Sequence, residues 1–195
     1  MPAVFTKLDA VNEILTGSGF APVSSLSSTG PANARTAEQF LDREFRTILA
    51  EGWWFNYQKD ATLVRNANNE IPIPSNILSI DGAGDDFIAI QGKVYSKSGQ
   101  TFTFTSDVSV DTITFFEFEE VPYEVQNYAT KVALRKYQHV RVGGRDALGQ
   151  HRVDERDARA ALIQKEGENG DANLLLNSNL RMHIRAERIG LDPSF

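Results

Sequence analysis

The feature that most constrains this chain is a change in the spacing of its apolar residues, from the helical period to the strand period and back. Apolar side chains recur every three to four residues up to Glu51 and again from Pro122 onward. Between these points aromatic and β-branched residues are common, and the run from Glu70 to Pro74 holds two prolines, which no helix interior accepts. The sequence therefore predicts helices, then strands, then helices.

Two helices are predicted before the β segment. The first covers residues 6–17, where Thr6 and Asp9 have the spacing of a capping box. The second covers residues 32–51, carries a clear apolar stripe and stops before Gly52. The residues between the two helices read as an ordered loop.

Two more helices are predicted after the β segment. The third covers residues 122–141 and opens on Pro122, which suits a first helical position. The fourth covers residues 150–166, is strongly charged, and is bounded by a predicted turn at 142–149 and a stop at Gly167.

The middle of the chain reads as short strands separated by turns at Gly92-Lys93 and Ser98-Gly99. Alternation predicts that Phe102 and Phe104 lie on one face of a strand. A last strand is predicted over residues 111–120. Because each amphipathic helix needs a partner for its apolar face, we expect an α+β fold in which four helices pack together. Residues 1–52 and 121–170 form this helical domain, residues 53–120 form a β-rich domain inserted between the second and third helices, and residues 171–195 form a C-terminal arm.

Composition excludes several classes of protein. The formal net charge of −6 argues against a free-standing nucleic-acid binder, and residues 52–120 hold 4 Lys and Arg against 10 Asp and Glu. The absence of cysteine excludes disulfides and thiolate metal sites. We expect no signal peptide and no membrane span, because no apolar run approaches the required length.

The chain lacks the sequence motifs of the common enzymes. Its histidines, His139, His151 and His183, have no metal-ligand spacing, and no phosphate-binding loop or nucleophile elbow is present. We therefore expect no cofactor. Glu117 and Glu119 are the one catalytic alternative: on a strand they would share a face about 6.5–7 Å apart, within the range for glycoside hydrolysis. Such pairs are usually solvated surface or a protected strand edge, which is the reading that we favour.

Two apolar features have both a structural and a functional reading. The tryptophan pair at Trp53 and Trp54 is a stacking platform or, as we favour, a seal between two cores. The arm is rich in large apolar residues, which favour either packing on its own domain or docking on another subunit. The apolar residues of the arm are Leu174, Leu175, Leu176, Leu180, Met182 and Ile184.

Three motifs in the first third of the chain resemble the tail tubular protein A family of short-tailed phages. They read AVNEILTGSGFAPVSSL from Ala10, ANAR from Ala32 and GWWFN from Gly52, in the order and spacing of that family. The positions that carry the resemblance are Asn12, Gly19, Pro22, Val23, Ser24, Asn33, Arg35, Gly52, Trp53, Phe55 and Asn56.

The resemblance implies a structural virion protein of a short non-contractile tail, made in the cytoplasm of the host bacterium. Members of the family form a ring of twelve subunits as a head-to-tail adaptor. One side of the ring docks on the portal protein, and the other holds the tubular nozzle protein, tail tubular protein B, and the tail fibres. Double-stranded DNA passes through the bore. A glycan-cleaving virion enzyme, or an adaptor with that side activity, is the alternative.

Overall fold

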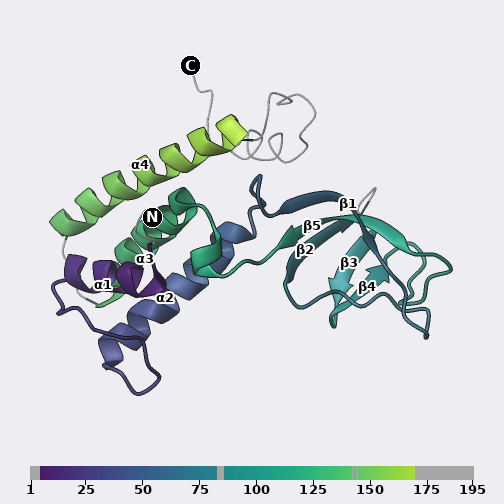
Figure 1. The fold of residues 1–195 in the computed structure, drawn as a ribbon, viewed down its shortest axis with the longest axis horizontal. Coiled ribbons are helices and arrows are strands. Elements are labelled where there is room, and N and C mark those ends of the chain that lie inside the picture. The colour runs from purple at the N-terminus through teal and green to yellow at the C-terminus, as the bar shows by residue number, and fades with distance from the viewer. Residues whose placement is uncertain (1–4, 83–85, 142, 144, 170–195) are drawn as a thin grey trace.

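The chain folds as a mixture of α-helices and antiparallel β-sheet, with the helices gathered at one end and the strands at the other (Figure 1). A computed structural model describes residues 5–82, 86–141, 143 and 145–169. The helices of these ranges are α1 (Lys7–Gly17), α2 (Ala32–Leu49), α3 (Tyr123–Arg141) and α4 (Arg145–Asn169). We call them together the helical part.

The first helix begins and ends as its sequence predicts. The backbone N–H of Asp9 donates to the Thr6 hydroxyl at 3.2 Å, and the Asp9 carboxylate accepts from the Thr6 backbone at 2.9 Å, which completes the capping box. The Thr6 hydroxyl also donates to the Asp9 carboxylate at 2.6 Å, and this bond together with the one from the Thr6 backbone holds the pKa of Asp9 below its ordinary value. At the other end Gly19 takes a positive φ of 80°, the left-handed conformation that glycine accepts readily.

The four helices share one hydrophobic core. α3 packs against α1, α2 and α4, and it lies between α4 and the α1–α2 pair (Figure 1). Fully buried side chains from α1, α2 and α3 fill the centre, whereas α4 contributes Ala158 and Leu162. Apolar stripes at helical spacing on four separate segments thus bury one another, as the pattern predicts.

The fourth helix is longer than the sequence pattern indicates. The predicted turn at residues 142–149 and the stop at Gly167 are wrong, because α4 already begins at Arg145 and continues to Asn169. Gly149 and Gly167 lie inside it, each at a position where a β-carbon would meet open space. A glycine in an exposed helix costs only about 1 kcal/mol relative to alanine, which packing elsewhere on the helix offsets.

The strands form two small sheets, which we call together the β part. One sheet has the order β1-β5-β2, built from β1 (Tyr57–Leu63), β5 (Val108–Thr114) and β2 (Ile77–Gly82). The other pairs β3 (Phe87–Ile90) with β4 (Lys93–Ser96). Their shared core is a separate cluster of six buried apolar residues, Leu63, Ile71, Ile80, Val94, Val108 and Val110.

Two strand predictions are wrong. Residues 101–105 form only isolated bridges and no strand, and the Phe102 ring packs on Tyr95 while the Phe104 ring packs on Phe87 beside the β core. The strand predicted to reach Glu120 ends at Thr114, and a short 3₁₀ helix, η2 (Phe118–Glu120), follows. The chain leaves the sheet here because the phenylalanines after Thr114 pack against the helical core.

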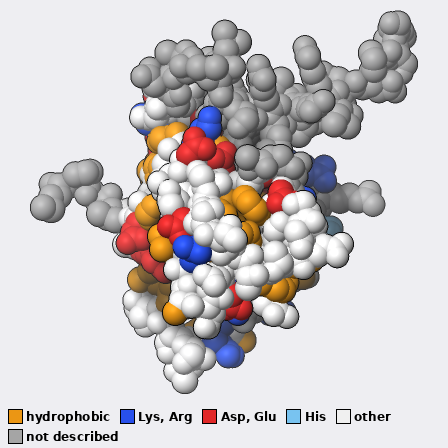
Figure 2. Space-filling view, turned by 90° about the vertical axis from the view of Figure 1, so that its right-hand side faces the viewer, with side chains coloured by type: hydrophobic (Ala, Val, Ile, Leu, Met, Phe, Trp, Pro, Cys, Tyr) orange, Lys and Arg blue, Asp and Glu red, His pale blue; other side chains and the backbone are white. Residues whose placement is uncertain are grey.

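The outer end of the β part carries little charge in the view of Figure 2. That face consists mainly of uncharged polar side chains and backbone, with acidic, basic and hydrophobic side chains scattered singly or in small groups. None of the helices in the described part of the chain is both long and apolar enough to span a membrane.

Candidate functional site

The GWWFN motif forms the joint between the helical part and the β part. Gly52 turns the chain with a φ of 78°, and Trp53 is only 2% exposed, with its indole N–H donating to the Ile48 carbonyl at 2.8 Å. Phe55 is half-buried against Trp54 and Phe116. Both tryptophans pack on the helical core and neither belongs to the β core, so the pair closes the end of one core and has the structural role that we favoured, without sealing two cores together.

Asn56 is the polar centre of this joint. Its side-chain amide donates to the Leu49 carbonyl at 2.8 Å and to the Thr114 carbonyl at 3.1 Å, and its side-chain oxygen accepts from the Trp53 backbone at 2.7 Å. Its own carbonyl accepts from the Thr114 N–H at 2.8 Å. One buried asparagine thus connects the end of α2 to the end of β5, which fixes how the two parts meet.

The first motif builds a clamp at the opposite end of the helical part. The Asn12 side chain donates to the Val23 carbonyl at 2.9 Å and accepts from the Val23 N–H at 2.7 Å, so it pairs with the loop as a neighbouring strand would. Val23 packs on the core, while Pro22 and Ser24 are exposed. The first motif therefore holds an ordered loop against α1 through Asn12.

The second motif contributes less to the packing. The Asn33 carbonyl accepts a 3.4 Å hydrogen bond from the hydroxyl of Tyr137, a fully buried residue of α3. Arg35 is exposed on α2. Its place in the motif has no packing explanation in this fold.

A surface hollow of about 300 Å³ lies beside the joint. Its floor contains Phe45 and Phe118, which are buried, and Phe115, which is half-buried. The Phe45 and Phe118 rings lie 5.2 Å apart, and the Arg46 guanidinium lies 4.9 Å above the Phe115 ring. The remaining lining residues are Lys7, Asp42, Glu117 and Glu119. We call this feature the junction hollow.

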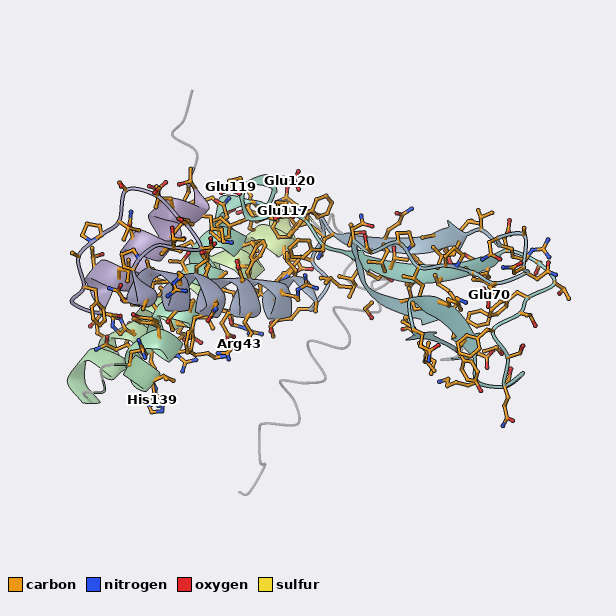
Figure 3. The ribbon with its side chains drawn as sticks, turned by 90° about the horizontal axis from the view of Figure 1, so that it is seen from below. Arg43, Glu70, Glu117, Glu119, Glu120 and His139 are labelled. Atoms are coloured by element: carbon orange, nitrogen blue, oxygen red, sulfur yellow. The ribbon has the colours of Figure 1, made fainter. Side chains whose placement is uncertain are left out.

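Glu117 and Glu119 both reach the junction hollow, although not on the strand that the sequence predicts. Glu117 precedes η2 and Glu119 lies within it, and Figure 3 shows both at one edge of the molecule together with Glu120. Glu119 accepts a 2.9 Å hydrogen bond from the Lys7 backbone. Both glutamates are exposed, and within the described ranges no lysine or arginine forms an ion pair with either.

The two cations of the junction hollow have partners other than Glu117 and Glu119. Lys7 forms ion pairs with Asp42 at 2.8 Å and with Glu38 at 3.0 Å. Burial alone would lower the pKa of Lys7, but the hydrogen bonds that Lys7 donates to Asp42 and Glu38 outweigh it and raise that pKa. Arg46 covers an aromatic ring. The exposed carboxylates at the rim are therefore not neutralised by their own surroundings, which makes the hollow suited to a ligand that is both apolar and basic.

Asp86 of the β part is held by backbone and hydroxyl groups, and two of the three histidines lie on α3 and α4. Asp86 accepts hydrogen bonds from the backbone of Ser98 at 2.7 Å and from the hydroxyl of Ser96 at 3.0 Å, and the Ser98 bonds hold its pKa below the ordinary value. His139 is exposed on the side of the helical part opposite Glu117 (Figure 3). Both ring nitrogens of His151 are buried without a hydrogen-bond partner. Among the described residues, no group of three or more potential ligands could hold a metal ion.

Sequence reasoning missed a set of charged residues between the helices. Glu44 is only 3% exposed and is held by Lys136 and Arg43. Glu44 lies beside Phe45 on the buried face of α2, and a single polar residue within an apolar stripe was the available signal. Arg135 pairs with Glu155 to tie α3 to α4.

The last turns of α4 hold a half-buried carboxylate, Glu166. Burial and the charge of Glu51 raise the pKa of Glu166 to about 7. Glu51 also lies 3.9 Å from the Arg159 guanidinium, which donates to the Tyr128 hydroxyl at 3.0 Å. We therefore expect the charge on Glu166, beside the end of α2, to change near neutral pH.

The predicted arm lies outside the described residues. All six of its apolar positions, Leu174, Leu175, Leu176, Leu180, Met182 and Ile184, fall beyond Asn169. Their role in subunit or partner contacts stays a prediction.

Comparison with known proteins agrees with the motifs. Residues 8–172 match the family model described as tail tubular protein. Tail tubular protein A of Klebsiella phage KP34 is 30% identical over 130 residues, which cover 64% of this chain and 69% of the relative. The chain belongs to the tail tubular protein family and is a structural protein of a phage tail.

Proposed function

We propose that this chain is the subunit of a ring-forming adaptor that joins the head of a short-tailed phage to its tail. The ring, of twelve subunits in the virion, binds the portal protein on one side. On the other it holds the tubular nozzle protein and the tail fibres. The observation that carries the proposal is the joint at Asn56, which fixes the β part to the helical part through buried hydrogen bonds. A subunit that must present several partners in fixed directions needs such a rigid connection.

The acidic middle of the chain suits a wall that DNA must pass without binding. Residues 52–120 hold 4 basic and 10 acidic residues, and like charges repel the phosphate backbone. Passage is then transient and independent of base sequence. We expect the purified protein to show no measurable affinity for double-stranded DNA at physiological salt.

Electron microscopy of the full-length protein, alone and co-expressed with its portal protein, tests the adaptor role. The expected result is a closed ring in at least one of the two samples, with the protein attached to one end of the portal. A protein that stays monomeric in both samples and never co-purifies with portal would contradict the proposal.

The glycosidase alternative has one specific observation in its favour, because Glu117 and Glu119 line the same hollow. The double substitution Glu117→Gln with Glu119→Gln tests it in a glycan-release assay. Loss of a measurable wild-type activity in this variant would assign the hollow to catalysis. We expect wild type and variant to give the same background signal.

A further inference from the structure

The junction hollow is the surface feature of this chain whose chemistry is least explained by the fold. Arg46 lies over Phe115 in its aromatic floor of Phe45, Phe115 and Phe118, and its rim carries Glu117 and Glu119 without an ion pair to a lysine or arginine among the described residues. An occupant that fits must bring apolar side chains for the floor and positive charge for the rim.

The arm of this chain has that composition. From Leu180 to Arg185 the sequence reads LRMHIR, in which the apolar residues Leu180, Met182 and Ile184 alternate with Arg181, His183 and Arg185. Residues 172–186 contain arginine but neither aspartate nor glutamate. An extended segment of this pattern presents an apolar side and a basic side.

We propose that the junction hollow receives residues 180–185 of the arm of a neighbouring copy, with the apolar side chains on its aromatic floor and the arginines at its acidic rim. This inference rests on the proposed ring, and it names the contact that joins one subunit to the next.

We assign the contact to a neighbouring copy because the proposed ring needs a contact that repeats from one subunit to the next. The arm begins after Asn169 at the end of α4, and α4 approaches the end of α2 through the ion pair of Arg159 with Glu51. The junction hollow lies on the α1, α2 and η2 side, as its lining residues show. Eleven residues from Asn169 to Leu180 span roughly 36 Å when extended, enough to cross to an adjacent molecule.

A contact of this kind is heterologous, because a segment of one copy meets a different surface of the next. Heterologous contacts repeat around a closed ring when the rotation between copies closes. The contact of the arm with the junction hollow would thus be repeated between successive subunits of the proposed ring, and no symmetric dimer interface would be needed.

Disulfide crosslinking tests the contact in the full-length chain, which has no cysteine of its own. The variant with Leu180→Cys and Glu119→Cys, oxidised in assembled tails, should give a ladder of covalent multimers. The matched control combines Leu180→Cys with Arg43→Cys, because the Arg43 side chain is 63% exposed and lies on the opposite side of the helical part (Figure 3). We expect no ladder from the control or from either single cysteine.

Each alternative outcome identifies what is wrong. Rings without the ladder would overturn the docking while leaving the adaptor role intact. Closure within one chain, seen as a faster-migrating monomer, would place the arm on its own subunit and also overturn the inference. If no ring forms with or without portal, both the proposed function and the contact fail.

Charge reversal provides a second test that does not depend on disulfide geometry. Glu117→Lys with Glu119→Lys should weaken assembly at least about tenfold, since like charges then meet at the rim. Adding Arg181→Glu and Arg185→Glu to the same chain should restore it. Circular dichroism of each variant confirms folding, and assembly of the first variant at the wild-type level would contradict the proposal.

Discussion

The helical part and the β part differ in how much apolar surface each buries. Within the described residues, the helical core contains 22 buried apolar residues, including Trp53 and Tyr137, whereas the β core contains six. Small cores stabilise a structure weakly, because the entropy of ordering the chain offsets most of the burial. The β part therefore depends on its connection to the helical part, and the joint residues matter more than their number suggests.

The joint also explains why one motif mixes aromatic and amide residues. Trp53 closes the larger core, and Asn56 holds the end of β5 against the end of α2. We therefore expect substitutions in the joint, in the β core and at the end of α4 to destabilise different regions of the molecule, and by different amounts of free energy.

The largest effect is expected for Trp53→Ala. Removing a tryptophan that is 2% exposed should cost about 3–5 kcal/mol of unfolding free energy and leave the Ile48 carbonyl without its indole donor. Urea unfolding followed by circular dichroism measures it. Trp54→Ala, at a half-buried neighbour, is the control and should cost less. Equal losses in the two variants would show that Trp53 does not close the core.

Ile71→Ala should be next and should act on the β part alone. Ile71 is fully buried in the small core, so the loss is about 2–5 kcal/mol. Hydrogen exchange should accelerate in β2, β4 and β5, while α1, α2 and α3 keep their wild-type protection. The control is Val64→Ala, whose side chain is 63% exposed in the same part. Uniform acceleration through the helices would mean that the two cores unfold as one unit.

Asn56→Ala should loosen the connection without emptying either core. The carbonyls of Leu49 and Thr114 lose their amide donor, and such unpaired groups cost about 1–3 kcal/mol. Amide hydrogen exchange should accelerate first at the ends of β1 and β5 that adjoin the joint. Asn12→Ala, which breaks the loop clamp at the far end of the helical part, is the matched control and should leave the strands unchanged.

The smallest effect is expected for Glu166→Gln, and it depends on pH. The pKa of Glu166 in the folded state, about 7, lies above its ordinary value of 4.5. Between pH 4.5 and pH 7 the folded state therefore keeps a proton that the unfolded state has already released. Wild-type stability should fall as pH rises through this window, by on the order of 1 kcal/mol after allowance for solvent screening.

The Glu166→Gln variant should lose that slope and be the more stable protein at pH 8. Thermal unfolding between pH 5 and pH 8 measures the difference. Glu168→Gln is the control on the same helix, because hydrogen bonding to Lys165 lowers rather than raises the pKa of Glu168. A wild-type slope that survives in Glu166→Gln would assign the titration to another group.

Local sequence features determined most of the secondary structure. The capping box at Thr6 and Asp9, the stop at Gly52 and the apolar stripes of α1, α2 and α3 depend on residues a few positions apart, and all three helices formed where the pattern placed them within two residues. The family motifs were also readable, because the packing of Trp53, Asn56 and Asn12 requires particular side chains at fixed short spacings.

Only the tertiary structure decided where the chain leaves the sheet and what gathers beside the joint. Residues 111–120 alternate like a strand. Nevertheless β5 ends at Thr114, because Phe115, Phe116 and Phe118 are packed in or against the helical core. The same packing places Glu117 and Glu119 beside Lys7 and Arg46, which are distant in the sequence. Backbone propensity and periodicity act over a few residues, whereas the junction hollow depends on burial shared between segments that meet only after folding.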